Sequence, residues 1–341
     1  MPIAHQYIER DSGQIRNERL IGDRLVSMLY DPVRERADWL FRALTGPVSS
    51  RLLAVLNFDL ALGTRLLGNR RFLARCGVDP AECLDPPETL DTPRKVFERR
   101  IRYWENRPMP DDSAVVVSPA DARVLVGSFA QVDNLFIKEK FFSFNELIGG
   151  HPVWSKAFTG GDYAVFRLTP DKYHYNHVPV SGRVVDIYAL DGSYHSCNPE
   201  AVVAIATPFS KNKRTVTVID TDVPGGTGVG LVAMIEVVAL MIGDIVQCYS
   251  RARYDAPQPV TIGMFLRKGQ PKSLYRPGSS TDVLLFQANR INFAADLLAN
   301  QARRDVTSRF SIGFEKQLVE TDLQVRSAIA TALPRMNGDQ P

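Results

Sequence analysis

Four adjacent residues, Gly278, Ser279, Ser280 and Thr281, combine a flexible backbone with hydroxyl groups ahead of an apolar run. A serine hydroxyl that loses its proton to a base can attack the carbonyl carbon of the residue before it. That attack cuts the chain and leaves a reactive group at the cut. The same residue types also form ordinary turns, because proline and glycine preset a bend and serine bonds nearby amides. The run therefore indicates self-cleavage only if the sequence also supplies a base.

Two of the five histidines, His174 and His177, lie close together and are the candidate bases. Histidine changes its protonation state near neutral pH, so either ring can take up or release a proton. Their spacing suits a metal pair only on a helix, and no third ligand stands nearby, so we expect no metal. An aspartate at a turn, Asp121 in Ser-Pro-Ala-Asp, completes the residue types of a nucleophile, a base and an orienting carboxylate.

Taken in order, these motifs resemble the phosphatidylserine decarboxylase family. They are Ser-Pro-Ala-Asp, ending at Asp121, then Tyr-His-Tyr-Asn-His-Val-Pro, then Gly-Ser-Ser-Thr before an apolar strand. Lys268 and Gly269 stand before the serine motif at the spacing of the subgroup with Gly-Gly-Ser-Thr. The resemblance covers residues 94–286 and is carried by an ordered set of motifs.

The resemblance implies that the chain cuts itself between Ser279 and Ser280, with Ser279 at a position where the family has glycine. Asp121 would orient His177, and His177 would take the proton of Ser280. Elimination of the resulting ester would convert Ser280 into a covalent pyruvoyl group, the expected cofactor. This group forms a Schiff base with the substrate amine and accepts the electrons left by carbon dioxide. His174 is the expected acid that then protonates the substrate.

The function implied is conversion of phosphatidylserine to phosphatidylethanolamine and carbon dioxide, by a homodimer of processed protomers. One alternative is a pyruvoyl-dependent decarboxylase of a soluble amino acid, such as an aromatic one. Another is a non-catalytic, membrane-associated relative in which Ser279 blocks maturation. Cleavage separates the last alternative from the first two, and the substrate separates those two from each other.

Composition limits the partners of the chain. Its 341 residues include 41 basic and 38 acidic side chains, and a net charge of +3 is too small to indicate nucleic-acid binding. The four cysteines form no paired motif, which favours a reducing compartment. No secretory signal is evident, and Glu236 and Asp244 interrupt the longest apolar run. We expect a peripheral membrane protein on the cytoplasmic side.

The first region that must position these residues, 1–93, is expected to be helical, with helices over 24–44 and 48–67. The second helix is apolar and ends in arginines, a pattern that fits either a lipid interface or packing on the protein core. A basic stretch with aromatic residues follows over 94–107 and can hold an anionic head group or form a solvated face.

The texture then changes to short runs rich in valine and isoleucine, which predict a mostly antiparallel sheet. The expected strands cover 114–117, 123–126, 163–168, 183–190, 201–206, 215–219, 232–240 and 283–286. The expected fold class is therefore α+β, and the family resemblance implies a barrel-like catalytic domain over 94–288. A C-terminal extension over 289–341 shows helical patterns at 294–302 and 322–332, without an evident role.

Overall fold

The computed structural model describes residues 4–18, 73–74, 77–130, 143–193, 197–204, 208–238, 244–277 and 280–334. The helices expected over 24–44 and 48–67 lie outside these residues. Residues 4–18 form a hairpin of β1 (Gln6–Glu9) and β2 (Ile15–Asn17), so the expectation of a helical start is wrong there. The reason is a distant partner, because β1 pairs in parallel with a strand more than 300 residues later in the chain.

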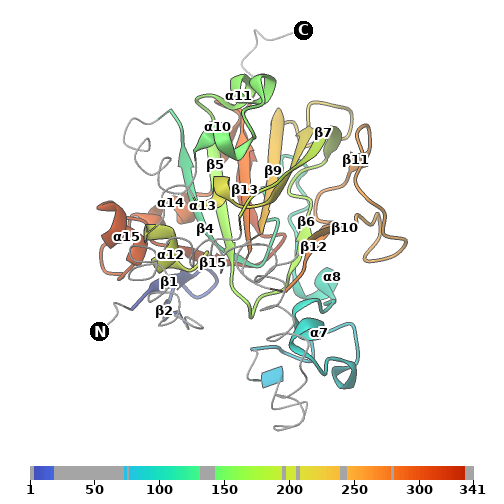
Figure 1. Cartoon of the computed structure of the whole chain (residues 1–341), viewed down its shortest axis with the longest axis vertical. Helices are drawn as coiled ribbons and strands as arrows, with labels where there is room; N and C mark the ends of the chain where they lie inside the picture. Colours follow the sequence, from blue (N-terminus) through green and yellow to red (C-terminus); the bar gives the residue numbers. More distant parts are fainter. Residues whose placement is uncertain are drawn as a thin grey trace.

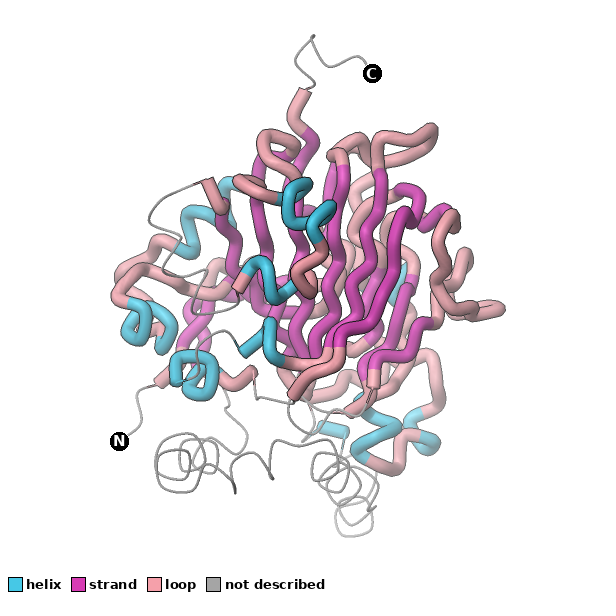
Figure 2. The backbone as a smooth tube through the Cα atoms, turned by 45° about the horizontal axis from the view of Figure 1, so that its top comes forward, coloured by secondary structure: helices cyan, strands magenta, loops and turns pink. Residues whose placement is uncertain are grey.

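Ten of the described strands form one mixed sheet, and Figures 1 and 2 show its strands side by side. Every pairing in it is antiparallel except that of β1 with β15, which confirms the expected mostly antiparallel sheet. The sheet ends at β11 and β2 and stays open within the described residues, so the expected barrel is wrong. Its order is β11 (Phe265–Leu266), β7 (Gly182–Leu190), β8 (Arg214–Asp220), β9 (Leu231–Val238), β13 (Ser280–Phe286), β5 (Asp162–Leu168), β4 (Ala122–Ser128), β15 (Thr321–Leu323), β1 and β2.

Two small sheets pack on one face of the large sheet. One has the order β10 (Ile245–Gln247), β12 (Pro271–Tyr275), β6 (Tyr175–His177), and the other β14 (Ile291–Phe293), β16 (Ala328–Ala332), β3 (Val115–Val117). Side chains alternate along a strand, so Leu284 of β13 belongs to the core beneath these small sheets, together with Tyr275 and Ile329.

Short helices cover the other face of the large sheet (Figure 2). Val283 and Leu285 of β13 belong to the core on that side. The helices contribute apolar side chains such as Phe158, Phe209 and Phe310 to this second core. These helices are α10 (Phe144–Leu147), α11 (Pro152–Phe158), α12 (Pro199–Ala204), α13 (Pro208–Lys211) and α15 (Arg309–Phe314). The remaining described helices are η3 (Pro87–Thr89), α7 (Pro93–Phe97), α8 (Tyr103–Asn106) and α14 (Ala295–Gln301). No helix among the described residues is long and apolar enough to cross a bilayer.

Two segments differ from the expected elements. A strand is expected over 201–206, but residues 201–204 belong to α12, which packs against α15; residues 205–206 lie outside the described residues. A short apolar run fits a buried strand and a buried helix equally well, and Pro199 at the first helical position favours the helix. The helix expected over 322–332 is replaced by β15 and β16, which find backbone partners in β4, β1, β3 and β14. The helix expected over 294–302 is confirmed by α14.

Candidate active site

Ser280 is the first residue of β13, a central strand paired on both sides. Its backbone lies opposite Leu168 of β5 and Val238 of β9. The side chain has no exposed surface, and its Oγ has no hydrogen-bond partner among the described residues. Ser279 lies outside the described residues. The expected cut therefore falls in the link between β12, which ends at Tyr275, and β13.

Asp121 lies at the same end of the large sheet as Ser280. Arg123 pairs with Arg167, and Arg167 pairs with Thr281, so these three residues form one row across β4, β5 and β13. Asp121 and Ser280 both stand just beyond that row. Because β5 separates their strands, the two backbones lie roughly 10 Å apart. Any action of Asp121 on Ser280 thus requires a group between them.

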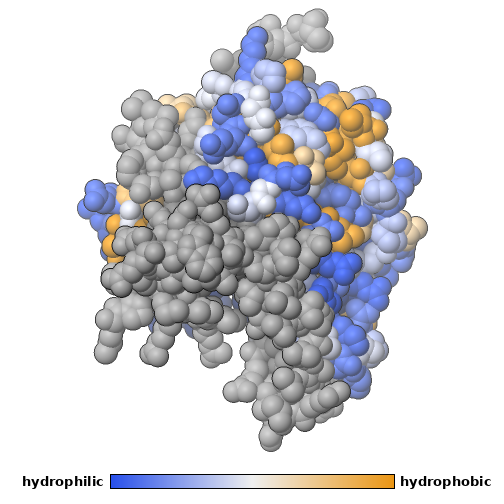
Figure 3. All heavy atoms as spheres, viewed as in Figure 1, coloured by the Kyte–Doolittle hydropathy of each residue, from blue (hydrophilic) through white to orange (hydrophobic). Residues whose placement is uncertain are grey.

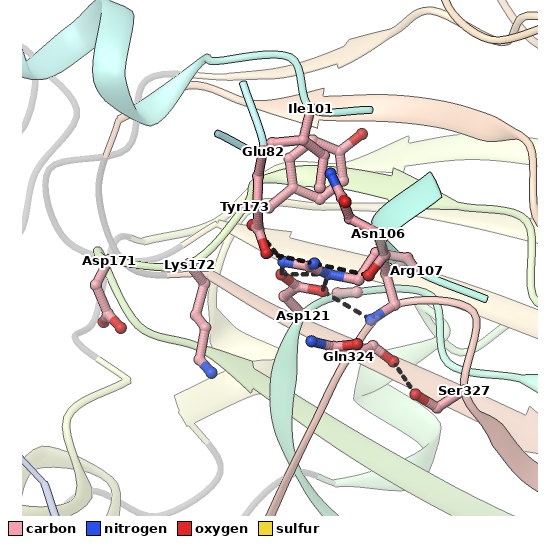
Figure 4. A network of polar contacts seen from close by, with 12 residues as sticks. Glu82, Ile101, Asn106, Arg107, Asp121, Asp171, Lys172, Tyr173, Gln324 and Ser327 are labelled. Atoms are coloured by element: carbon pink, nitrogen blue, oxygen red, sulfur yellow. Dashed lines mark hydrogen bonds and ion pairs between the residues drawn. The ribbon is translucent and has the colours of Figure 1, made fainter. Parts of the chain in front are cut away.

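Arg107 holds the Asp121 carboxylate from two directions. Its Nε donates to Oδ1 at 3.1 Å and its Nη2 donates to Oδ2 at 3.0 Å. The backbone N–H of Val325 donates to Oδ1 at 2.8 Å, and Glu82 binds the outer side of the guanidinium (Figure 4). Burial raises the pKa of Asp121, but the charge and hydrogen bonds of Arg107 outweigh it and hold this pKa below its usual value. Asp121 is therefore an anion near neutral pH.

His177 is buried and held in one tautomer. Its Nδ1 lies 2.9 Å from the carbonyl oxygen of Gly269, which can only accept, so Nδ1 carries the proton. The lone pair on Nε2 then accepts from the Tyr173 hydroxyl at 3.0 Å. Burial lowers the pKa of His177 to about 3, against the opposing effects of the Gly269 bond and the Asp121 charge. The ring is neutral at pH 7 and presents a lone pair, as a base must.

The carbonyl of Gly269 orients His177 where we expected a carboxylate to do so. The described contacts include no hydrogen bond between Asp121 and His177, so orientation by Asp121 stays a prediction. Gly269 has a φ of +75°, and a Cβ there would lie 2.3 Å from the Met109 sulfur. Lys268 anchors the same turn by donating to the carbonyls of Asp112 at 2.6 Å and Val115 at 2.8 Å. Lys268 and Gly269 thus hold the turn in which the Gly269 carbonyl faces Nδ1 of His177.

His174 directly precedes β6 and is buried. Its carbonyl accepts from the N–H of Tyr275, five residues before Ser280. The ring stacks on Phe97 with centroids 3.4 Å apart, and neither ring nitrogen has a partner among the described residues. Burial and then the Arg99 charge lower the pKa of His174 to about 3. The ring is therefore neutral at pH 7.

The basic stretch over 94–107 is largely committed to contacts within the protein. Arg99 is buried and donates to the carbonyls of Asp171 and Lys172, next to His174. Arg107 is buried against Asp121, so neither guanidinium is available to a lipid. The visible surface beside α7 and α8 is mostly hydrophilic (Figure 3). The remaining cations form ion pairs, namely Arg94 with Glu98, Lys95 with Asp91, Arg100 with Asp85 and Arg102 with Glu105.

Sequence reasoning missed two neighbours of the site, Arg107 and Tyr173. Arg107 was visible as one of several arginines, but its pairing with Asp121 depends on how residues 103–107 approach β4. Tyr173 precedes His174 in the histidine motif, and its hydroxyl also lies 2.7 Å from that of Tyr254. Tyr254 is held by the backbone of Ile101. These tyrosines close the outer side of the His177 ring.

A separate cluster of His5, Glu18 and Glu320 has the residue types of a metal site. Two observations indicate a buried ion network instead. His5 donates from one nitrogen to Glu320 at 2.8 Å and accepts the Arg309 N–H on the other at 3.1 Å, so both nitrogens are engaged. Arg167 already neutralises both carboxylates, at 2.7 Å and 2.6 Å. This network ties β1 and β15 to β5.

The buried serine, the two neutral histidines and the arginine-bound aspartate are the residue types with which enzymes carry out nucleophilic and acid–base chemistry. The sequence model described as phosphatidylserine decarboxylase matches residues 94–310, and the chain belongs to that family. A phosphatidylserine decarboxylase proenzyme of Fusobacterium nucleatum is 26% identical over 321 residues, covering 90% of this chain and 95% of the relative. One of Chlamydia pneumoniae is 30% identical over 296 residues, covering 86% and 91%. Proenzyme 2 of Oryza sativa is 32% identical over 228 residues, covering 65% and 33%.

Proposed function

We propose that this chain is a proenzyme that cuts itself between Ser279 and Ser280 and then converts phosphatidylserine to phosphatidylethanolamine and carbon dioxide. The observation that carries the proposal is the buried Oγ of Ser280 at the head of β13, which has no hydrogen-bond partner among the residues that the structure describes. A buried hydroxyl without a partner costs about 1–3 kcal/mol, so such a group needs a reason to be there. Self-cleavage by that hydroxyl is the reason that the family of proenzymes supplies.

In the proposed maturation, His177 takes the proton of Ser280, whose oxygen attacks the carbonyl carbon of Ser279. The neutral ring and the proton on Nδ1 suit this step, since Nε2 is the lone-pair nitrogen. Nε2 must exchange its hydrogen bond with Tyr173 for one with the serine hydroxyl. The negative charge of Asp121 favours the protonated ring that results. Arg107 keeps this charge in place.

The pyruvoyl group expected at residue 280 supplies an electron sink for the electrons released with carbon dioxide. The chain fits such a group, because residue 280 is buried and its β13 backbone is fixed by neighbours on both sides. His174 would hold or deliver the proton that replaces the lost carboxylate. Its stack on Phe97 keeps the ring in place and excludes water from one side.

The lipid substrate implies a peripheral position on the cytoplasmic side of a membrane, and we propose a homodimer of processed protomers there. Sedimentation with anionic liposomes tests the first part, and the mass of the assembled particle tests the second. The same preparation should release carbon dioxide from phosphatidylserine vesicles. Release from free aromatic amino acids, without release from vesicles, would favour a soluble substrate instead.

Intact mass of the purified protein tests the cleavage. We expect two chains, residues 1–279 and residues 280–341, with a pyruvoyl group at the start of the smaller one. Ser280→Ala and His177→Ala should stay uncut, whereas His174→Ala should be cut but turn over slowly. His151→Ala, a histidine that stacks on Trp154 away from these residues, is the matched control and should behave as wild type. An uncut chain with full activity would refute the proposal.

A further inference from the structure

A second set of buried charged groups lies on the same face of the large sheet as Ser280. Ser280 and Asp282 are two residues apart on β13, so their side chains point to the same face. Asp282 stands directly opposite Glu236 of β9. Neither carboxyl group has any exposed surface. The strands therefore bring two buried carboxyl groups close to the residue expected to become the cofactor.

Glu236 is fixed as an anion by four donors. Lys272, which is itself fully buried, donates to Oε2 at 2.7 Å, and Gln247 donates to the same oxygen at 2.9 Å. Asn176 donates to Oε1 at 3.2 Å, and the Ser273 hydroxyl donates to the same atom. Hydrogen bonds of this number stabilise the charged form of a carboxylate. The single buried ammonium group of this set is thus used by Glu236.

The contacts of Asp282 call for a proton. Its Oδ1 lies 2.7 Å from the Tyr275 hydroxyl, which also lies 3.0 Å from the carbonyl oxygen of Thr281. That hydroxyl has one proton for two acceptors, and it already accepts the N–H of Val237. If Asp282 is protonated, it can donate to Tyr275 while Tyr275 donates to Thr281. Both contacts are then hydrogen bonds.

The charges around Asp282 lead to the same result. From β9 it faces Glu236, from β12 it faces Lys272 and Tyr275, and its neighbour on β5 is the apolar Phe166. Lys272 and Glu236 cancel, so an ionised Asp282 would be a buried anion without a counter-ion of its own. Burial and then the Glu236 charge raise the pKa of Asp282 well above its usual value. Its Oδ2 meanwhile has no partner among the described residues.

We propose that Asp282 carries a proton in the resting protein and releases it when positive charge forms on a nitrogen bound at residue 280. This inference rests on the proposed function, which brings an amine to that residue. When a neutral amine condenses with a carbonyl group, a carbon–nitrogen bond forms and the oxygen leaves as water. One proton of that water comes from the amine and the other from Asp282. The carboxylate left behind then pairs with the cationic nitrogen.

Asp282→Asn separates a proton donor from a structural group, because asparagine has the shape of the protonated acid but cannot release a proton. In the uncut Ser280→Ala protein we expect an infrared band of a protonated carboxyl group, absent from Ser280→Ala/Asp282→Asn. In the cut protein, Asp282→Asn should retain self-cleavage but release carbon dioxide about 100-fold more slowly. The control is Thr217→Val, which removes another buried, unpartnered hydroxyl from the same sheet face.

Two results would overturn the proposal: a carboxyl band that survives Asp282→Asn, or turnover by that variant within about threefold of wild type. If Asp282→Asn fails to fold, Glu236→Gln decides through the same spectrum. Lys272 would then lack its anion and favour ionised Asp282, so the band should disappear, and its persistence would contradict us. If wild type itself releases no carbon dioxide, the proposed function fails, while the spectrum still reports on Asp282.

Discussion

Replacing Arg107 with methionine removes the group that holds Asp121 in place. The two side chains are only 7% and 8% exposed, and two of their contacts measure 3.1 Å and 3.0 Å. Breaking such a buried pair costs about 3–5 kcal/mol, because one charge is left without a partner. The outer pair with Glu82, which is 34% exposed, adds about 0–1 kcal/mol. We therefore expect Arg107→Met to lower the free energy of unfolding by about 4 kcal/mol.

The pH dependence of stability gives a second measure of the same pair. In wild type the pKa of Asp121 is lower in the folded state, so its contribution is present above pH of about 4 and is lost on acidification. In Arg107→Met, burial is opposed only by the Lys172 charge and the Val325 N–H, so we expect this pKa to rise above its usual value and Asp121 to destabilise the fold as pH rises. Urea unfolding of both proteins in the uncut Ser280→Ala background measures the two effects.

The double variant Arg107→Met/Asp121→Asn is the control, since removing the buried charge should restore part of the lost stability. We expect the two changes to be non-additive by about 0.5–3 kcal/mol. A loss below about 1 kcal/mol in Arg107→Met, with an unchanged pH slope, would refute the view that a buried ion pair supports this site.

Two further substitutions, and one property of the cut protein, have defined outcomes. Gly269→Ala should slow self-cleavage and destabilise the fold by about 1–3 kcal/mol, because φ is +75° and the new Cβ meets Met109. The control is Gly263→Ala, where φ is +86° and nothing lies within 4 Å of the new Cβ, so only stability should change. Equal cleavage rates in the two variants would contradict this prediction. Lys272→Met should destabilise by about 3–5 kcal/mol in urea unfolding, since it strands the Glu236 anion, and Lys272→Met/Glu236→Gln should recover part of this loss. After cleavage the two chains should co-elute in gel filtration and separate only in denaturant; a small chain that elutes alone would show that β13 is not held by its neighbours.

Sequence alone predicted the residues best where the chemistry is local. The serine motif, the histidine pair and Asp121 were selected from local motifs and from the family resemblance, and the structure places the described ones in buried positions, while their roles stay predictions. The pairing of Arg107 with Asp121 and the aim of the Gly269 carbonyl at His177 could not be predicted, because each joins segments set by tertiary contacts. In the sequence, Lys268 and Gly269 indicate only the spacing to the serine motif, and their contact with His177 is evident only from the structure.

The central strands of the fold were predicted from the sequence, whereas the strands near the two ends of the chain were not. Runs rich in valine and isoleucine correctly indicated β5, β7, β8, β9 and β13, and in β5, β8, β9 and β13 both faces are largely buried. Residues 4–18 and 321–332 carry no such signal, and their strands β1, β15 and β16 pair with strands that are distant in the sequence, namely β1 with β15, β15 with β4 and β16 with β3. The segment described from sequence as an extension of unknown role instead supplies the Val325 N–H to Asp121.

Because β13 is a central strand, the proposed cut would depend on correct folding of the whole sheet. Its partners β5 and β9 come from residues 162–168 and 231–238, and β15 from the same end of the chain lies between β4 and β1. In the proposed maturation, Ser280 would meet its base only after these distant segments have assembled. A misfolded or truncated chain would therefore remain uncut and inactive. The cell would gain decarboxylase activity only from molecules that had already folded correctly.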